Sequence, residues 1–236
     1  MLPNIVTIFG ICVGLTAVRM ALEGNINLAL YLLVFAMILD AVDGRLARAL
    51  QSESKIGAEL DTLADFFNFG IATPLVIYLT IFADTAASRF GWIAVMVFSV
   101  CCALRLARFN VQSELADKKH FTGLPSPVAA ALVAGFVWST YPLNMSFPLV
   151  ILGALMTATA GLLMVSNLRY PSFKEIDFRG RVPFFVILAV VMGFVVITID
   201  PPRILFTIAL VFSFSAPLRW VWAHFRPVGE NVDSAK

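Results

Sequence analysis

The chain has 236 residues, of which 60% are hydrophobic and 14% are charged, and its net charge is +2. A soluble domain averages about 25% charged and 45–50% apolar residues. The composition therefore excludes a water-soluble protein and predicts one whose apolar surface faces lipid.

Eight hydrophobic segments are predicted in chain order. They cover approximately residues 3–22, 26–47, 58–82, 92–108, 128–141, 148–165, 183–199 and 204–222. Most are about as long as the 17–25-residue helix that crosses a bilayer; the fifth is shorter and follows residues 123–127 (GLPSP). None shows the period-2 alternation of a barrel strand. The pattern predicts an all-α, polytopic transmembrane helical bundle of about eight spans.

Lysine and arginine residues are concentrated at alternate ends of these segments. All but three of the 17 lie on one side of the predicted membrane or in the C-terminal tail, and the exceptions are Arg19, Arg89 and Arg203. Cytoplasmic loops attract basic residues, so we expect both termini to face the cytoplasm. We expect a single membrane-embedded domain over residues 1–225 and a polar cytoplasmic tail over residues 226–236.

Four aspartates lie where the second segment ends and the third begins. Asp40 and Asp43 share one face of a helix, because residues three or four apart are neighbours on a helix surface. Asp61 and Asp65 share a face of the next helix by the same rule. The connection between the segments is short, which predicts antiparallel neighbours whose acidic faces oppose one another.

Carboxylates gathered at a membrane boundary repel one another and are costly to desolvate, so a cation must offset them. No lysine or histidine lies on either acidic face. Ligands that are all oxygen favour Mg²⁺, Mn²⁺ or Ca²⁺ over zinc. Two divalent ions would neutralise four carboxylates, and two-metal sites recur in phosphoryl transfer. The candidate metal ligands are Asp40, Asp43, Asp61 and Asp65.

Two other interpretations of these aspartates are open. They could be helix-packing or simply solvated residues, or they could form the carboxylate relay of an ion or proton transporter. Transport favours carboxylates near the bilayer midplane on broken helices. These lie toward the predicted cytoplasmic ends of their segments, which suits a substrate that arrives from the cytosol.

The same stretch carries a specific signature, D-x2-D-G-x2-A-R-x8-G-x3-D-x3-D. Its fixed positions are Asp40, Asp43, Gly44, Ala47, Arg48, Gly57, Asp61 and Asp65. This pattern resembles the signature of the CDP-alcohol phosphotransferase family. Further stretches, at residues 2–7, 63–70, 105–110, 121–127 and 166–174, are similar to the bacterial and archaeal membrane-embedded phosphatidylserine synthase branch. The resemblance spans roughly residues 2–175.

The resemblance implies a six-helix core and a CDP-diacylglycerol–serine O-phosphatidyltransferase of phospholipid biosynthesis. Such an enzyme moves the phosphatidyl group of CDP-diacylglycerol to the hydroxyl of L-serine, with Mg²⁺ or Mn²⁺, and gives phosphatidylserine and CMP. The four aspartates are then metal ligands for two ions, and Asp65 is also the general base. The implied CDP-diacylglycerol-binding residues are Asn4, Thr7, Gly44, Ala47, Arg48 and Gly57.

The resemblance also implies the surroundings of the enzyme. We expect an integral protein of a prokaryotic cell membrane, in contact with membrane lipids, with its active site on the cytoplasmic side. A homodimer follows by analogy with the family, and no nucleic-acid partner is expected.

The acceptor site is assigned to Arg105 and Arg108. A serine carboxylate requires a cation, and a forked guanidinium suits it. Other cations lie in nearby loops, at Lys118, Lys119, Arg169 and Arg179. Any one of these basic residues could instead serve positive-inside topology or contact an anionic lipid. Two alternative functions are open. One is a sister enzyme that uses choline, inositol phosphate or glycerol phosphate, which the stretches at residues 105–110 and 123–127 disfavour. The other, from a different class, is a divalent-cation or proton transporter.

Overall fold

The computed structural model describes residues 2–49, 55–113, 120–141, 146–171 and 200–225, and almost all of them are helical. The helices are α1 (Leu2–Leu22), α2 (Ile26–Ala49), α3 (Lys55–Asp65), α4 (Thr73–Ile77), α5 (Ser88–Ser113), α6 (Ser126–Thr140), α7 (Phe147–Val165) and α9 (Pro201–Phe225), with π-helical segments η1 (Phe66–Ala72) and η2 (Tyr78–Phe82). Two three-residue strands, β1 (His120–Thr122) and β2 (Arg169–Pro171), form the single sheet of the described residues. Apart from this small sheet, the predicted all-α bundle is confirmed.

Within the described residues, six helices are long and apolar enough to cross a membrane, so the chain is an integral membrane protein. They match six of the eight predicted segments, and the third of them, Ile56–Phe82, joins α3, η1, α4 and η2 into one continuous helix. The fifth predicted segment forms α6, which has only 15 residues. The seventh, 183–199, and the tail, 226–236, lie outside the described residues.

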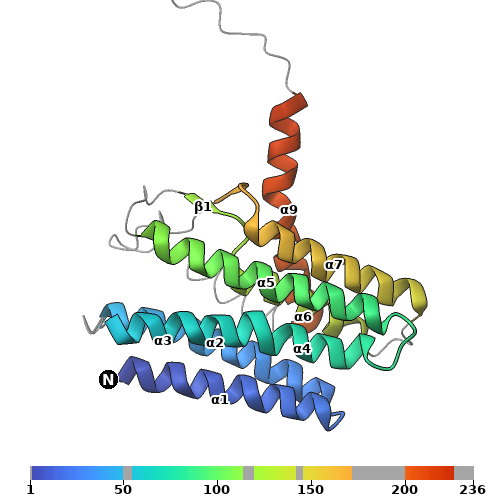
Figure 1. Ribbon diagram of the computed structural model, residues 1–236, viewed down its shortest axis with the longest axis horizontal. Helices are drawn as coiled ribbons and strands as arrows, with labels where there is room; N and C mark the ends of the chain where they lie inside the picture. The colour runs from blue at the N-terminus through green and yellow to red at the C-terminus, as the bar shows by residue number, and fades with distance from the viewer. Residues whose placement is uncertain (1, 50–54, 114–119, 142–145, 172–199, 226–236) are drawn as a thin grey trace, which may run out of the picture.

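The helices form two packed groups (Figure 1). In the first, α1 packs against α2, α3 and η1; in the second, α5 packs against α7. As predicted, α2 and α3 run in opposite directions, and the N-terminus of α1 lies at the same end of the bundle as the α2 C-terminus and the α3 N-terminus (Figure 1). Three helix ends therefore meet where the aspartates lie. The C-terminal half of α9 projects beyond the bundle.

The short helix α6 occupies the centre of the bundle. It contacts α2 and α4 of the first group, α7 of the second, and α9. Every residue from Ala129 to Trp138 is buried. Small residues let the backbones approach closely, as is usual between membrane helices: a Cβ at Gly135 would lie 2.9 Å from the Phe206 backbone. A helix enclosed by protein along its length is stabilised without reaching across the bilayer.

The helix that carries Asp61 and Asp65 widens directly after Asp65. In the π-helical segment η1, the backbone N–H of Thr73 donates to the carbonyl of Asn68, and the Thr73 hydroxyl donates to the same oxygen at 2.8 Å. Pro74 follows and has no N–H to give to the preceding turn. π-helical turns inside α-helices are frequent at functional sites.

The small sheet fixes the stretch that leads into α6. β1 and β2 pair antiparallel, with Phe121 opposite Tyr170. The Tyr170 hydroxyl donates to the carbonyl of Ser213 at 3.0 Å, and burial raises the pKa of this phenol to about 12, so it keeps its donor proton. Gly123 follows β1 with φ of +84°, and a Cβ there would lie 2.2 Å from the carbonyl oxygen of Met164. The turn therefore requires glycine.

We expect Gly14→Ala to destabilise the protein, because a Cβ at this position of α1 would lie 2.2 Å from Asn68 Oδ1 and 3.2 Å from Phe67 Cε1. Overpacking of this kind costs about 1–3 kcal/mol. The matched control is Gly10→Ala, one turn earlier, where the nearest atom lies at 3.6 Å. The melting temperature of the purified protein should fall for Gly14→Ala and stay near the parent value for Gly10→Ala. Equal melting of the two variants would contradict this tight contact between α1 and η1.

Candidate metal centre

The four predicted aspartates meet at one end of the bundle. One carboxylate oxygen from each of Asp40, Asp43 and Asp61 lies within 4.8 Å of the others. Asp65 lies one turn after Asp61 on the same helix, close enough to Asp40 and Asp61 for their charges to act on it. The helical faces predicted from the spacing therefore do oppose one another across α2 and α3.

Asp43 is the most deeply buried acid of the cluster, with 3% of its surface exposed. Its Oδ2 accepts a hydrogen bond from the Thr7 hydroxyl at 2.9 Å, which ties α1 to α2. Its Oδ1 is buried and has no hydrogen-bond partner among the described residues, and the same holds for Oδ1 of Asp65. Buried polar oxygens are rarely left unpaired, since the lost hydration costs about 1–3 kcal/mol. Both oxygens are thus open to a ligand.

These residues fit a divalent cation. The carboxylates of Asp40, Asp43 and Asp61 lie close together, and the Arg105 guanidinium on α5 is a described cation whose charge acts on Asp65. The cluster gathers several carboxylates in a partly buried place, and Oδ1 of Asp43 and of Asp65 lacks a donor among the described residues. The donor set consists of carboxylate oxygens, the ligands that hard divalent ions prefer.

The residues predicted to bind CDP-diacylglycerol lie around this cluster. Asn4 lies one turn before Thr7 on α1, and Gly44 directly follows Asp43; both are partly buried. Gly57 lies one turn before Asp61 on α3 and is also partly buried. Ala47 and Arg48 belong to the last turn of α2, but their side chains lie outside the described part of the chain.

The two arginines predicted to bind the serine acceptor contact different parts of the structure. Arg105 donates to the Ser126 hydroxyl at the start of α6, at 2.5 Å, and its charge reaches Asp65. Arg108 donates to Asn167 Oδ1 at 2.9 Å and lies 3.5 Å from the carbonyl oxygen of Val165, the last residue of α7. The structure therefore brings Arg105 to the aspartates. Arg108 instead binds the C-terminal end of α7, where a cation also suits the helix dipole.

Sequence analysis gave no role to Asn68, which lies three residues after Asp65 and so on the same side of its helix. Its side chain is buried beside Gly10 and Gly14 of α1, and its Oδ1 has no partner among the described residues. A polar amide inside an apolar segment was the signal that could have identified it. Ser126, the partner of Arg105, gave no comparable signal, because its contact depends on how α5 and α6 pack.

We expect Thr7→Val to weaken metal binding by about 10–100-fold, the usual effect of removing a hydrogen bond that orients a ligand. Valine has the shape of threonine without the hydroxyl that donates to Asp43. The matched control is Thr16→Val on the same helix, where the hydroxyl donates to the Cys12 carbonyl of its own helix. Calorimetric titration with Mn²⁺ compares the dissociation constants. Equal affinity in the two variants would show that Thr7 does not orient Asp43 for a metal.

Comparison with known proteins places the chain in a family. The family model described as CDP-alcohol phosphatidyltransferase matches residues 1–165, which is more than half of the chain. The chain therefore belongs to the CDP-alcohol phosphatidyltransferase family, as its signature predicted.

Several relatives carry the name CDP-diacylglycerol–serine O-phosphatidyltransferase. The protein of Mycobacterium leprae is 43% identical over 141 residues, which cover 58% of this chain and 46% of that protein. The chain thus matches about half the length of the mycobacterial relatives. The protein of Helicobacter pylori strain J99 is 31% identical over 236 residues, or 99% of this chain and 96% of that protein. An archaetidylserine synthase of Methanothermobacter thermautotrophicus is 30% identical over 175 residues, or 72% and 69% of the two chains.

Proposed function

We propose that the protein transfers the phosphatidyl group of CDP-diacylglycerol to the hydroxyl of L-serine and releases CMP. The observation that carries this proposal is the group of carboxylates from α2 and α3 inside a chain of the CDP-alcohol phosphatidyltransferase family. Two buried oxygens of this group, Oδ1 of Asp43 and of Asp65, have no hydrogen-bond partner among the described residues. The names of the relatives support serine as the acceptor, above all the one aligned over nearly the whole of both chains.

In this proposal Asp40, Asp43, Asp61 and Asp65 hold two divalent ions, Mg²⁺ or Mn²⁺. Such ions supply positive charge to the diphosphate of the CDP-lipid and to the phosphate of the departing CMP. Thr7 holds Asp43 in its orientation through the bond at 2.9 Å. The absence of a side chain at Gly44 and Gly57 leaves room for the nucleotide beside the carboxylates. Asn4, Thr7, Ala47 and Arg48 complete the site for CDP-diacylglycerol.

The chemical step uses groups of the chain and the two substrates. The serine hydroxyl oxygen forms a bond to the phosphorus on the lipid side of the diphosphate, and the bond from that phosphorus to the CMP oxygen breaks. The electron pair leaves with CMP, and Asp65 accepts the hydroxyl proton as general base. Arg105, held by Ser126 beside Asp65, offers its remaining N–H groups to the serine carboxylate.

The same proposal includes the placement of the enzyme. We propose that both termini and the aspartate cluster face the cytoplasm, since basic residues are concentrated at that end. We also propose a single domain over residues 1–225 and, by analogy with the family, a homodimer.

The purified protein, supplied with CDP-diacylglycerol, Mg²⁺ and a panel of alcohols, provides the test. We expect CMP release with L-serine and much less with choline, glycerol phosphate or inositol phosphate. Strong release with another alcohol and none with serine would assign the chain to a sister enzyme. No release with any alcohol, together with ion flux in liposomes, would favour a transporter.

We expect Arg105→Gln to raise the KM for serine by tenfold or more, because it removes the cation beside Asp65. The KM for CDP-diacylglycerol should change little. Arg108→Gln is the matched variant on the same helix: it should lower the melting temperature, because Arg108 binds the end of α7, and change the serine KM less. Steady-state kinetics and thermal melting of both variants check this. A larger rise in serine KM for Arg108→Gln would place the acceptor carboxylate at Arg108 instead.

A further inference from the structure

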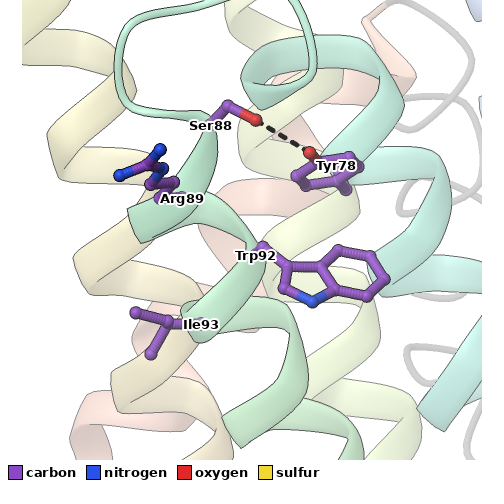
Figure 2. A pocket seen from close by; sticks show the side chains of 5 residues that line it. All are labelled: Tyr78, Ser88, Arg89, Trp92 and Ile93. Carbon is purple, nitrogen blue, oxygen red and sulfur yellow. Dashed lines mark hydrogen bonds between the residues drawn. The ribbon is translucent and has the colours of Figure 1, made fainter.

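An open, mostly apolar cavity lies at the opposite end of the bundle from the aspartates. It has a volume of about 550 Å³ and is lined by Tyr78, Ser88, Arg89, Trp92 and Ile93. Figure 2 shows these side chains around the first turns of α5, with Arg89 and Ile93 on one side and Tyr78 and Trp92 on the other. Tyr78 follows Asp61 by 17 residues on one continuous helix, which separates the two sites by about 25 Å at 1.5 Å per residue.

The cavity lies where two spans reach the membrane surface. Tyr78 belongs to the last turns of the span Ile56–Phe82, and Ser88 is the first residue of the span Ser88–Val111. Tyrosine and tryptophan are enriched at this depth, where headgroups meet acyl chains. The Tyr78 and Trp92 rings pack edge to face, with centroids 5.1 Å apart. Trp92 and Ile93 remain 45% and 57% exposed, so they present an apolar wall to lipid.

Arg89 differs in its pairing from Arg19 and Arg203, the arginines predicted on the same side of the membrane. Arg19 pairs with Glu23 at 2.8 Å, and Arg203 pairs with Asp200 at 3.2 Å. Arg89 has neither an ion pair nor a hydrogen bond with any residue that the structure describes, although Asp84 lies five residues before it. Its positive charge is therefore available to an anion in the cavity.

The hydroxyl groups beside Arg89 supply further donors. Tyr78 Oη and Ser88 Oγ lie 2.8 Å apart and share one hydrogen bond. Whichever hydroxyl donates in that bond, the other keeps its own proton for a ligand. A guanidinium and a free hydroxyl above an exposed apolar wall match a phosphate ester that carries a hydrocarbon chain.

We propose that this cavity binds an anionic phospholipid of the leaflet opposite to the active site. The lipid phosphate accepts hydrogen bonds from Arg89 and from the Tyr78–Ser88 pair, while an acyl chain lies along Trp92 and Ile93. The site is separate from the aspartate cluster, and the proposal does not depend on the reaction assigned to that cluster.

Lipid binding to the purified, delipidated full-length chain tests this proposal. Native mass spectrometry in EDTA, which keeps metal from the aspartates, counts bound phosphatidylglycerol and phosphatidylcholine of identical acyl chains. We expect the parent to bind one phosphatidylglycerol at least tenfold more tightly than phosphatidylcholine, and to melt at a higher temperature with it. Arg89→Gln should lose this preference, and Ser88→Ala should weaken it severalfold. Arg203→Gln, the matched change at a paired arginine, should keep it.

An activity assay distinguishes this lipid site from the catalytic site. Arg89→Gln should retain the parent rate of CMP release in detergent, because it lies far from the aspartates. Equal binding of the two lipids by the parent, or parent-like preference in Arg89→Gln, would overturn the proposal. Stabilisation by inorganic phosphate equal to that by phosphatidylglycerol would also overturn it, because the cavity would then recognise a free anion and not a lipid. If Arg89→Gln does not fold, Ser88→Ala provides the test. A preference of Ser88→Ala for phosphatidylglycerol equal to that of the parent would then contradict the proposed site.

Discussion

Asp65→Asn is expected to lower the rate of CMP release by about 10²–10⁴-fold, the contribution of one general base. The substitution keeps the shape of the side chain but removes a ligand charge and the acceptor of the serine proton. Asp65 lies at the junction of α3 and η1, where its Oδ1 is buried without a hydrogen-bond partner among the described residues and the charges of Asp40, Asp61 and Arg105 act on it. The initial rate with saturating CDP-diacylglycerol and serine measures the effect.

Glu59→Gln is the matched control for this variant. Glu59 lies on the same helix and is exposed, and the same loss of one carboxylate charge there should leave the rate near that of the parent. The melting temperature of Asp65→Asn should be at or above the parent value, since one repelling charge is removed. A loss of less than tenfold would exclude Asp65 both as base and as metal ligand.

Removal of divalent metal is expected to abolish the reaction. Excess EDTA should reduce CMP release to background, and added Mg²⁺ or Mn²⁺ should restore it, whereas Zn²⁺ should not. The reason is the ligand set: the cluster offers carboxylate oxygens and neither sulfur nor imidazole. Activity assays with each ion in turn provide the measurement. Full turnover in EDTA, or recovery with Zn²⁺ equal to that with Mg²⁺, would contradict the proposed site.

Helical periodicity predicted the acidic faces of α2 and α3 well. The spacing of Asp40, Asp43 and Asp61 places them on faces that oppose one another once a short connection makes the helices antiparallel, and the structure brings their oxygens within 4.8 Å. These relations are local, so sequence carries them. The roles of the aspartates as metal ligands stay predictions.

Contacts between distant helices could not be predicted in the same way. Arg105 and Arg108 are three residues apart and share a helix face, yet one meets Ser126 and the other meets the end of α7. Their partners come from segments whose packing no local rule sets. The bond from Thr7 to Asp43 likewise spans 36 positions and depends on how α1 crosses α2.

The expected length of a membrane span also did not account for α6. Fifteen residues are short for a span, but this helix is buried along its length by α7, α9 and the first group of helices. The π-helical turns after Asp65 were missed because hydrophobic periodicity is too coarse to detect one additional residue in a turn.

Binding of Mn²⁺, followed by electron paramagnetic resonance during titration, tests the central claim most directly, because it reports the metal without requiring either substrate. The parent is expected to bind two Mn²⁺ ions per chain. Asp43→Asn, which removes the most buried carboxylate charge of the cluster, should lose at least one of them or bind at least tenfold more weakly, and Glu59→Gln should match the parent. Binding of Mn²⁺ by Asp43→Asn with the affinity and number of the parent would contradict the assignment of the aspartate cluster as the metal centre.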